Sequence, residues 1–452
     1  MRTVICSPCG ILGYGFPMAS FEAALREKPD FIIVDAGSTD AGPHKLGAGV
    51  GIVSRRATKK DLSALLAGAK ALDIPLIVGS AGGSGARKHT EWTVEIVQEI
   101  LGEIDWNPKL AVIWADINKD YILEKMAAGQ VEKMSPNVPD LTEESLQETN
   151  GVVAQMGAEP VMAALKGGAQ VIICGRAYDP APFAAAGILR GHDPALCFHL
   201  GKILECGALC AEPGTAKDCM IGVLEDENFV VYPTNPARTC NPVSVAAHTF
   251  YEKDHPYLLR GPGMLLDLSA CEFEQLPGGR VRVTGSKMQT VPNTVKLEGA
   301  RQVAWRTFVI AGIRDPLLIK ALPQVEREVE ESVREYYSDI PAKSYQIHFY
   351  HYGQNAVMGE LEPETALPWE IGLLFEVIAD SQELANTVCA SLRSTLLHFG
   401  YPGRKSTAGN LAFPFAPSDV SFGPVYAFSV YHLMRVDDPL SLFPIEYSGG
   451  QT

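Results

Sequence analysis

The sequence predicts an α/β fold: a parallel sheet with helices on both faces, followed by a smaller α+β domain. In the first half of the chain, short apolar runs alternate with longer amphipathic stretches. The apolar runs are continuous rather than alternating, which is typical of strands buried on both faces. From about residue 215, short alternating strands replace this pattern. We therefore expect an α/β domain over residues 1–214 and an α+β domain over residues 215–452 that closes a cleft.

Five apolar runs rich in β-branched residues predict the strands of the sheet, namely Thr3–Cys6, Phe31–Asp35, Pro75–Gly79, Leu110–Trp114 and Val171–Gly175. Apolar residues at helical spacing predict helices at about Pro17–Lys28, Thr58–Leu72 and His89–Leu101. Five strand–helix units fit an open, doubly wound sheet better than an eight-unit barrel.

The second half mixes helices and strands without a repeat. We expect helices at Phe198–Ala211, Val325–Tyr337 and Gln382–Phe399, and strands at Phe229–Tyr232, Arg280–Thr284, Gln346–Tyr352 and Ile371–Ile378. The segment Lys296–Gly299 is interpreted as a loop of the second domain that faces the cleft.

Composition excludes several classes of protein. Lys and Arg number 38 against 53 Asp and Glu, a net charge of −15, which disfavours nucleic acid and anionic membrane surfaces as partners. The sequence contains neither a membrane-length apolar run nor a secretory signal, and its ten cysteines are too sparse for a disulfide scaffold. We expect a cytoplasmic enzyme that forms a homo-oligomer.

The segments that follow the five predicted strands carry the strongest functional signal. Ligands of parallel α/β sheets bind beyond the carboxyl ends of the strands. Polar, Gly-rich or ionisable residues follow every strand, in Cys6–Gly10, Asp35–Gly42, Gly79–His89, Ala115–Asp116 and Gly175–Asp179. Loops of this kind are also ordinary surface turns, but the one-sided clustering favours a shared site.

The segment Gly79–His89 resembles an anion cradle, because glycines let backbone N–H groups approach a ligand at the start of a helix. The segment ends with three basic residues, Arg87, Lys88 and His89. A tight turn with solvated cations would show the same pattern. We expect a small anionic substrate, carboxylate or phosphate, and the predicted binding residues are Ser38, Thr39, Ser80, Gly82, Gly83, Ser84, Arg87, Lys88 and Arg176.

Carboxylates at the strand ends suit general acid–base chemistry. The predicted catalytic residues are Asp35, Asp40, Asp179 and His89. Asp35 and Asp116 are candidate ligands for Mg²⁺, the one cofactor that the pattern suggests. Each aspartate taken alone could instead cap a helix. A hydrolase or acyl transferase with Cys6 or Ser38 as nucleophile is an alternative, and His89 is then its partner.

Five strings resemble the AtuA family, which is named for acyclic terpene utilisation. They are Val34–Asp40, Gly79–Gly83, Gly175–Asp179, His199–Gly207 and Thr407–Pro414. The resemblance implies a place in terpene catabolism, beside acyl-CoA carboxylase and lyase steps, and a small companion protein. Because the chain ends soon after Ile445–Tyr447, the companion is expected as a separately encoded subunit.

We therefore expect an enzyme that acts on a small carboxylic acid or its CoA thioester. A lyase of the hydratase or dehydratase type, in acid or terpene catabolism, fits the strand-end carboxylates best. The other alternative is a non-catalytic or partner-dependent subunit of a carboxylase or lyase complex.

Overall fold

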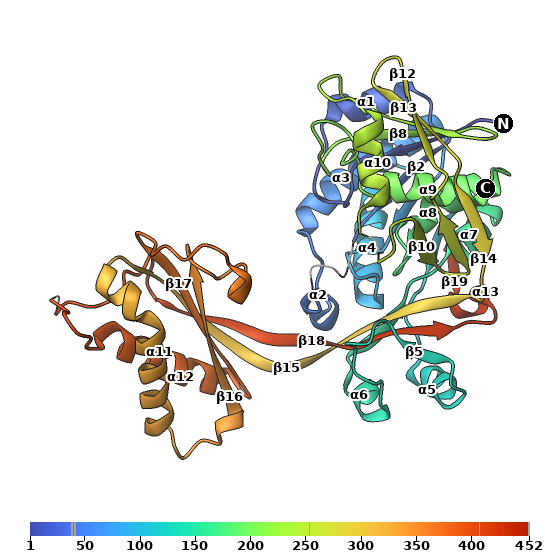
Figure 1. Ribbon diagram of the computed structural model, residues 1–452. Coiled ribbons are helices and arrows are strands. Elements are labelled where there is room, and N and C mark those ends of the chain that lie inside the picture. Colours follow the sequence, from blue (N-terminus) through green and yellow to red (C-terminus); the bar gives the residue numbers. More distant parts are fainter. Residues whose placement is uncertain (38, 40–41, 253, 406, 451–452) are drawn as a thin grey trace. The chain divides into compact units, whose positions relative to one another are not determined.

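The computed structural model describes residues 1–37, 39, 42–252, 254–405 and 407–450 (Figure 1). The fold is mixed α/β and divides into two compact units. Unit 1 comprises Met1–Arg301 and Phe428–Thr452, and unit 2 comprises Gln302–Ala427. In the described ranges, no helix has the length and apolar character needed to cross a membrane.

The helices of unit 1 are α1 (Met18–Arg26), α2 (His44–Ala48), α3 (Arg55–Leu72), α4 (Arg87–Glu103), α5 (Lys119–Ala127), α6 (Glu143–Glu148), α7 (Ala158–Lys166), α8 (Ala181–Leu189), α9 (Pro194–Leu204), α10 (Pro242–Phe250) and α13 (Pro439–Leu442). Its strands are β1 (Thr3–Ser7), β2 (Phe31–Asp35), β3 (Leu76–Gly79), β4 (Leu110–Ile113), β5 (Val131–Lys133), β6 (Gly151–Ala154), β7 (Val171–Cys174), β8 (Met220–Leu224), β9 (Phe229–Pro233), β10 (Leu258–Gly261), β11 (Met264–Asp267), β12 (Glu272–Leu276), β13 (Arg280–Thr284), β14 (Lys287–Thr290) and β19 (Ile445–Ser448).

Unit 2 contains α11 (Pro316–Tyr336), α12 (Gln382–His398), β16 (Tyr345–Tyr352), β17 (Ile371–Ala379) and the short 3₁₀ turns Ala342–Ser344 and Gly359–Leu361. The chain passes from unit 1 to unit 2 within β15 (Thr294–Ile313) and returns within β18 (Asp419–Arg435).

The large sheet of unit 1 is open and mixed, with the strand order β12-β13-β9-β8-β1-β2-β3-β7-β4-β19 over the described residues. Its five central strands β1, β2, β3, β7 and β4 are parallel, and they are the five strands predicted from the apolar runs. Antiparallel strands extend the sheet on both sides. The linear order with two edges confirms an open sheet rather than a barrel.

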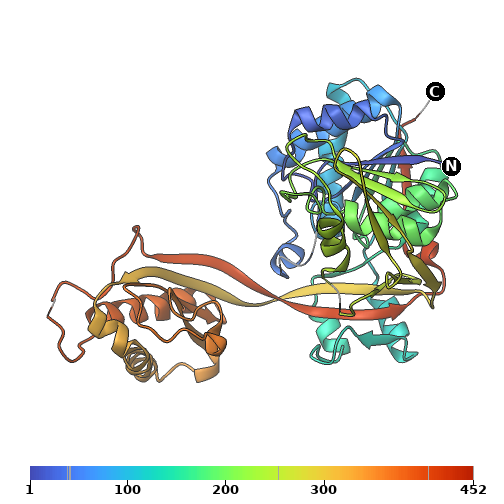
Figure 2. The same cartoon turned by 45° about the horizontal axis from the view of Figure 1, so that its top comes forward.

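Side chains from the two faces of this sheet enter two different hydrophobic cores, which explains the continuous apolar runs. Along β1, Val4 and Cys6 enter the core that contains Leu62 and Leu65 of α3, and Ile5 enters the core that contains Phe183 of α8. Helices α1, α3 and α4 thus cover one face and α7, α8 and α9 cover the other (Figure 2). All five parallel strands are buried from end to end.

The boundary expected between residues 214 and 215 falls inside unit 1. The reason is that β8 pairs antiparallel with β1 over five residues, Thr3–Ser7 against Met220–Leu224. Strands β8, β9, β12 and β13, which follow residue 215, therefore extend the first sheet instead of starting a new domain. The expected loop Lys296–Gly299 is also wrong, because it belongs to β15 and pairs with β6.

Unit 2 is built from strands with two helices on one face. Val309 and Ile313 of β15, Ile347 of β16 and Phe375 of β17 share a core with the apolar faces of α11 and α12. Both helices were predicted. α11 begins at Pro316, earlier than expected, and continues through Pro323.

The Gly-rich loops after β2 and β3 pack backbone against backbone. A methyl group on Gly37 would overlap the backbone of Gly83, whereas a methyl group on Gly102, in α4, would meet open space. We expect Gly37→Ala to lower the free energy of unfolding by about 1–3 kcal/mol through overpacking. Gly102→Ala, the matched control, should raise it by about 0.5–1 kcal/mol through helix propensity. Urea denaturation of both variants measures this, and equal stabilities would contradict the close packing.

Candidate functional site

Eight ionisable side chains gather at the carboxyl edge of the parallel strands. We call this group the carboxyl–cation cluster, and its members are Asp35, Arg176, Tyr178, Asp179, Lys202, Glu205, Lys296 and Glu298. They come from the ends of β2 and β7, from the end of α9 and from β15. Every contact described for them lies within unit 1.

Glu298 is the fully buried centre of the cluster. Its Oε2 accepts a hydrogen bond from Arg176 Nε at 2.8 Å, and its Oε1 lies 2.9 Å from Lys296 Nζ. Oε1 also accepts hydrogen bonds from Thr39 Oγ1 at 2.8 Å and Gln155 Nε2 at 3.3 Å. Burial alone would raise the pKa of Glu298, but Arg176 and then Lys296 lower it to about 2. Glu298 is therefore ionised at any ordinary pH.

The other side of the Arg176 guanidinium faces the end of β3 and the loop after β7. Nη1 donates to Ser80 Oγ at 3.0 Å, to the Ala177 carbonyl at 3.0 Å and to Asp179 Oδ1 at 2.9 Å. Ser80 Oγ also accepts the Ala177 N–H at 3.2 Å. Arg176 is thereby held in one orientation by Glu298 and presented to Asp179.

Three carboxyl groups of the cluster have raised pKa values. Burial is the main cause for each of them, and repulsion from a neighbouring carboxyl group adds to it. The pKa of Asp35 is raised well above its usual range by burial and then by Asp179. The pKa of Asp179 is also raised, although Arg176 opposes the shift. Burial raises the pKa of Glu205 to about 8 against the pull of Lys202, so Glu205 is mostly neutral at pH 7.

Helix α9 brings the remaining cation to the cluster. Lys202 Nζ donates to Glu205 Oε1 at 2.9 Å, lies 3.5 Å from Glu252 Oε2 and sits 4.2 Å from the centre of the Tyr251 ring. Lys202 and Glu205 are both less than a tenth exposed. By contrast, 32% of the Asp179 side chain is exposed. Solvent therefore reaches the cluster at Asp179, while Lys202, Glu205 and Glu298 are buried.

Several predicted site residues do meet in the structure. Asp35, Asp179 and Arg176 lie in the cluster, and Ser80 and Thr39 hydrogen-bond to its members. Ser38 and Asp40 lie outside the described residues.

Side chains of the protein occupy the space beside the glycines of the expected anion-binding loop, Gly79–His89. A methyl group on Gly82 would overlap His89, and one on Gly83 would overlap Ile52. Ser84 is buried in the same loop, whereas Arg87 and Lys88 are exposed. Arg87 stacks on Trp114 with its guanidinium carbon 4.1 Å from the ring centre. The glycines thus serve close packing, and the positive charge at the site comes from other residues.

His89 and Asp116 have partners outside the carboxyl–cation cluster. His89 is buried, its Nε2 lies 3.1 Å from the Val50 carbonyl, and burial lowers its pKa. Asp116 Oδ1 accepts the Arg87 N–H at 3.1 Å, at the start of α4. The strand order places β3 and β7 between β2 and β4, so Asp35 and Asp116 are separated by three strand spacings of about 5 Å each. They cannot share one metal ion.

No group of three His, Cys, Asp or Glu side chains in the described part of the chain is arranged to hold a metal ion. Cys6, the predicted alternative nucleophile, is fully buried, and burial raises the pKa of its thiol to about 12. A thiol in that state is a poor nucleophile.

The sequence interpretation missed Tyr178, Lys202, Glu205, Lys296 and Glu298 as site residues. Two signals could have found the charged ones. Lys202 and Glu205 interrupt an otherwise apolar helix at a spacing of three, and Lys296 and Glu298 share one face of a strand. Charges embedded in apolar elements are seldom buried unless they are paired.

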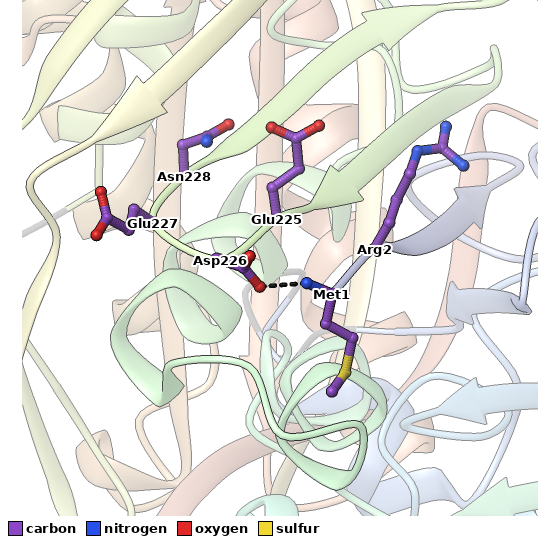
Figure 3. Close-up of a pocket in the computed structure, with 6 residues that line it drawn as sticks. All are labelled: Met1, Arg2, Glu225, Asp226, Glu227 and Asn228. Atoms are coloured by element: carbon purple, nitrogen blue, oxygen red, sulfur yellow. Dashed lines mark hydrogen bonds and ion pairs between the residues drawn. The ribbon is translucent and has the colours of Figure 1, made fainter.

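A hollow on the surface of unit 1 lies at the opposite edge of the sheet (Figure 3). It is lined by Met1, Arg2 and the residues of the turn between β8 and β9, Glu225–Asn228. Because Thr3 pairs with Leu224 and Ser7 pairs with Met220, this turn lies at the amino end of β1. It is therefore separate from the cluster, which lies at the carboxyl ends.

The fold and the site define a mixed α/β protein with a buried carboxyl–cation cluster at the carboxyl edge of its parallel strands. The model of the family described as acyclic terpene utilisation family protein AtuA matches residues 55–416, well over half of the chain, and the chain belongs to this family. This membership gives the chain a role in acyclic terpene utilisation. Neither the comparison with curated proteins nor the comparison with solved structures found a match.

The ion pairs of Glu298 give a direct stability prediction. Glu298→Gln should lower the free energy of unfolding by about 3–5 kcal/mol, because it leaves Arg176 and Lys296 buried without their counter-charge. The control Glu99→Gln removes an exposed carboxylate that pairs with Lys59 and should change the stability little, because exposed ion pairs are screened by solvent. Urea unfolding measures both, and a loss no larger than the control's would contradict the central role of Glu298.

The raised pKa of Glu205 gives a pH-dependence. The ordinary value is 4.5 and the folded value is about 8, so the folded state keeps a proton that the unfolded state releases. The stability that this proton provides is full below pH 4.5 and is lost as pH rises through about 8. We expect Glu205→Gln to become more stable relative to the wild type from about pH 5 to about pH 9, measured by urea unfolding. The stability difference of Glu99→Gln should stay flat there, because the pKa of Glu99 is lowered.

Proposed function

We propose that the chain is an enzyme of carboxylic acid or acyclic terpene catabolism. It would be a lyase of the hydratase or dehydratase type that acts on a small carboxylic acid or its CoA thioester. The observation that carries the proposal is the set of carboxyl groups with raised pKa values, Asp35, Asp179 and Glu205, beside oriented cations. Perturbed carboxyl groups of this kind cluster at catalytic sites.

Adding or removing water across a carbon–carbon double bond requires one group that moves a proton at carbon and a second that assists at oxygen. Asp179 suits the first role, because Arg176 favours its ionised form and solvent reaches its side chain. Glu205 suits the second role as a neutral carboxyl that donates a hydrogen bond. The two carboxyls thus differ in environment, as an acid–base pair must.

The charge balance of the cluster supports an anionic substrate or transition state. Arg176, Lys202 and Lys296 are positive, and Glu298 is the one carboxyl of the cluster with a lowered pKa. Ionised Glu298, and Asp179 in the ionised form that Arg176 favours, offset two of the three positive charges, whereas burial favours the neutral forms of Asp35 and Glu205. A bound anion would restore the balance.

The nucleophile alternative loses support for Cys6, since Cys6 is buried and His89 contacts the Val50 carbonyl. Its other candidate, Ser38, lies outside the described residues. A partner-dependent subunit remains the competing proposal for the function. The homo-oligomer and the separately encoded companion subunit remain proposals about the partners of the chain. Mg²⁺ also remains a proposal, and its effect is included in the test.

The test measures the incorporation of deuterium from the solvent at a carbon atom of the substrate or product. The purified chain is incubated in D₂O with unsaturated and hydroxylated small acids and their CoA thioesters, with and without Mg²⁺, and products are read by mass spectrometry. Asp179→Asn should lower the rate about 10²–10⁴-fold, because it removes the proton-transfer group, whereas Glu99→Gln should match the wild type.

Turnover that survives in Asp179→Asn would reject the assigned mechanism. A wild-type chain that is inert with every compound, and becomes active only after a companion protein is added, would favour the partner-dependent subunit instead.

A further inference from the structure

Two polar atoms beside Asp179 are buried without a hydrogen-bond partner among the described residues. They are the hydroxyl oxygen of Tyr178 and Oε2 of Glu205. Asp35 Oδ1, a third atom of the cluster, is likewise buried without a partner. Buried polar groups in folded proteins are nearly always hydrogen-bonded, because leaving them unpaired is costly. Three such atoms in one charged cluster indicate that a bound molecule supplies the missing partners.

Tyr178 and Glu205 are near neighbours in the cluster. Tyr178 follows β7 and its ring lies beside Phe198 of α9, with 6.4 Å between the ring centres. Glu205 caps the end of the same helix. Among charged groups, Glu205 and then Asp179 act most strongly on the Tyr178 hydroxyl.

The geometry at Lys202 decides which oxygen of Glu205 carries the proton. Lys202 Nζ donates to Oε1 at 2.9 Å, so Oε1 is an acceptor. In the neutral carboxyl the proton then resides on Oε2, the oxygen without a partner. A pKa of about 8 for Glu205 is consistent with this neutral form. Tyr178 and Glu205 thus offer one hydrogen-bond donor each.

We propose that the Tyr178 hydroxyl and the neutral Glu205 carboxyl form an oxyanion-binding pair for the carbonyl oxygen of an acyl thioester. The inference rests on the proposed function and names its substrate class. Removing the α-proton of a thioester puts one negative charge on the carbonyl oxygen, whereas the same step on a free carboxylate would create a dianion. Two neutral donors suit the single charge of the thioester.

The step balances for dehydration of a β-hydroxyacyl thioester. The Asp179 carboxylate takes the α-proton, the C–H electron pair forms a carbon–carbon double bond, and the carbonyl π pair moves onto the oxygen held by Tyr178 and Glu205. The oxyanion then collapses and the β-hydroxyl leaves. It takes the proton from Asp179 and departs as water, so the products are the enoyl thioester and water with no net proton change.

The test separates proton removal from the rest of the reaction. Butyryl-CoA has an α-proton but no leaving group, so its exchange in D₂O, read by mass spectrometry, reports oxyanion formation alone. Tyr178→Phe should slow exchange about 10²–10³-fold, while its thermal midpoint stays equal or rises, because an unpaired buried hydroxyl is removed. Glu205→Gln, which keeps one N–H donor, should lose less activity than Glu205→Leu.

Tyr232→Phe is the matched control, since the Tyr232 hydroxyl donates to Glu27 at 2.8 Å. It should lose some stability and keep the exchange rate. If the wild type exchanges or hydrates thioesters and Tyr178→Phe does so equally fast, the oxyanion pair is wrong and the proposed function stands. If the wild type turns over free acids but no thioester, the substrate class is wrong. If it turns over neither, the proposed function fails as well.

Discussion

The burial of the Glu298 carboxylate between Arg176 and Lys296 is the constraint on which the site depends. A charge that is fully removed from water must be paired, and two cations together with the Thr39 hydroxyl and the Gln155 amide meet that need. Because these partners come from distant parts of the chain, their shared acceptor ties β15 to the carboxyl ends of β2 and β7. The orientation of Arg176, and through it the environment of Asp179, follows from this pairing.

Asp179 and Glu205, the two carboxyl groups of the proposed mechanism, differ because of their surroundings and not because one is an aspartate and the other a glutamate. Asp179 keeps contact with solvent and with Arg176, whereas Glu205 is buried and held at one oxygen by Lys202. A low-dielectric setting favours the neutral form of a carboxyl, and a nearby cation favours the ionised form. In the proposed mechanism Asp179 is ionised and Glu205 is neutral, as proton transfer at carbon and hydrogen bonding at oxygen require.

The stability of the molecule and its proposed activity place opposite demands on the cluster. Unpaired polar atoms such as Tyr178 OH and Glu205 Oε2 weaken the folded state. The extensive apolar cores on both faces of the sheet provide the stability against which such a cost can be tolerated. The Gly-rich loops contribute by packing closely, as Gly37 does against Gly83, so that the strand ends form a rigid support.

The sequence by itself determined the five parallel strands and their covering helices, because burial on both faces leaves continuous apolar runs such as Phe31–Asp35. It also placed Asp35, Arg176 and Asp179 at one edge, since parallel strands end on the same side. Only the tertiary structure decided that β8 completes the first sheet and that Glu298 reaches Arg176. Strand pairing and buried ion pairs join residues far apart in the chain, and local patterns carry no record of such contacts. Arg87, His89 and Asp116 are plausible site residues by their spacing, but their contacts lie outside the cluster. Arg87 stacks on Trp114, His89 contacts the Val50 carbonyl and Asp116 accepts the Arg87 N–H.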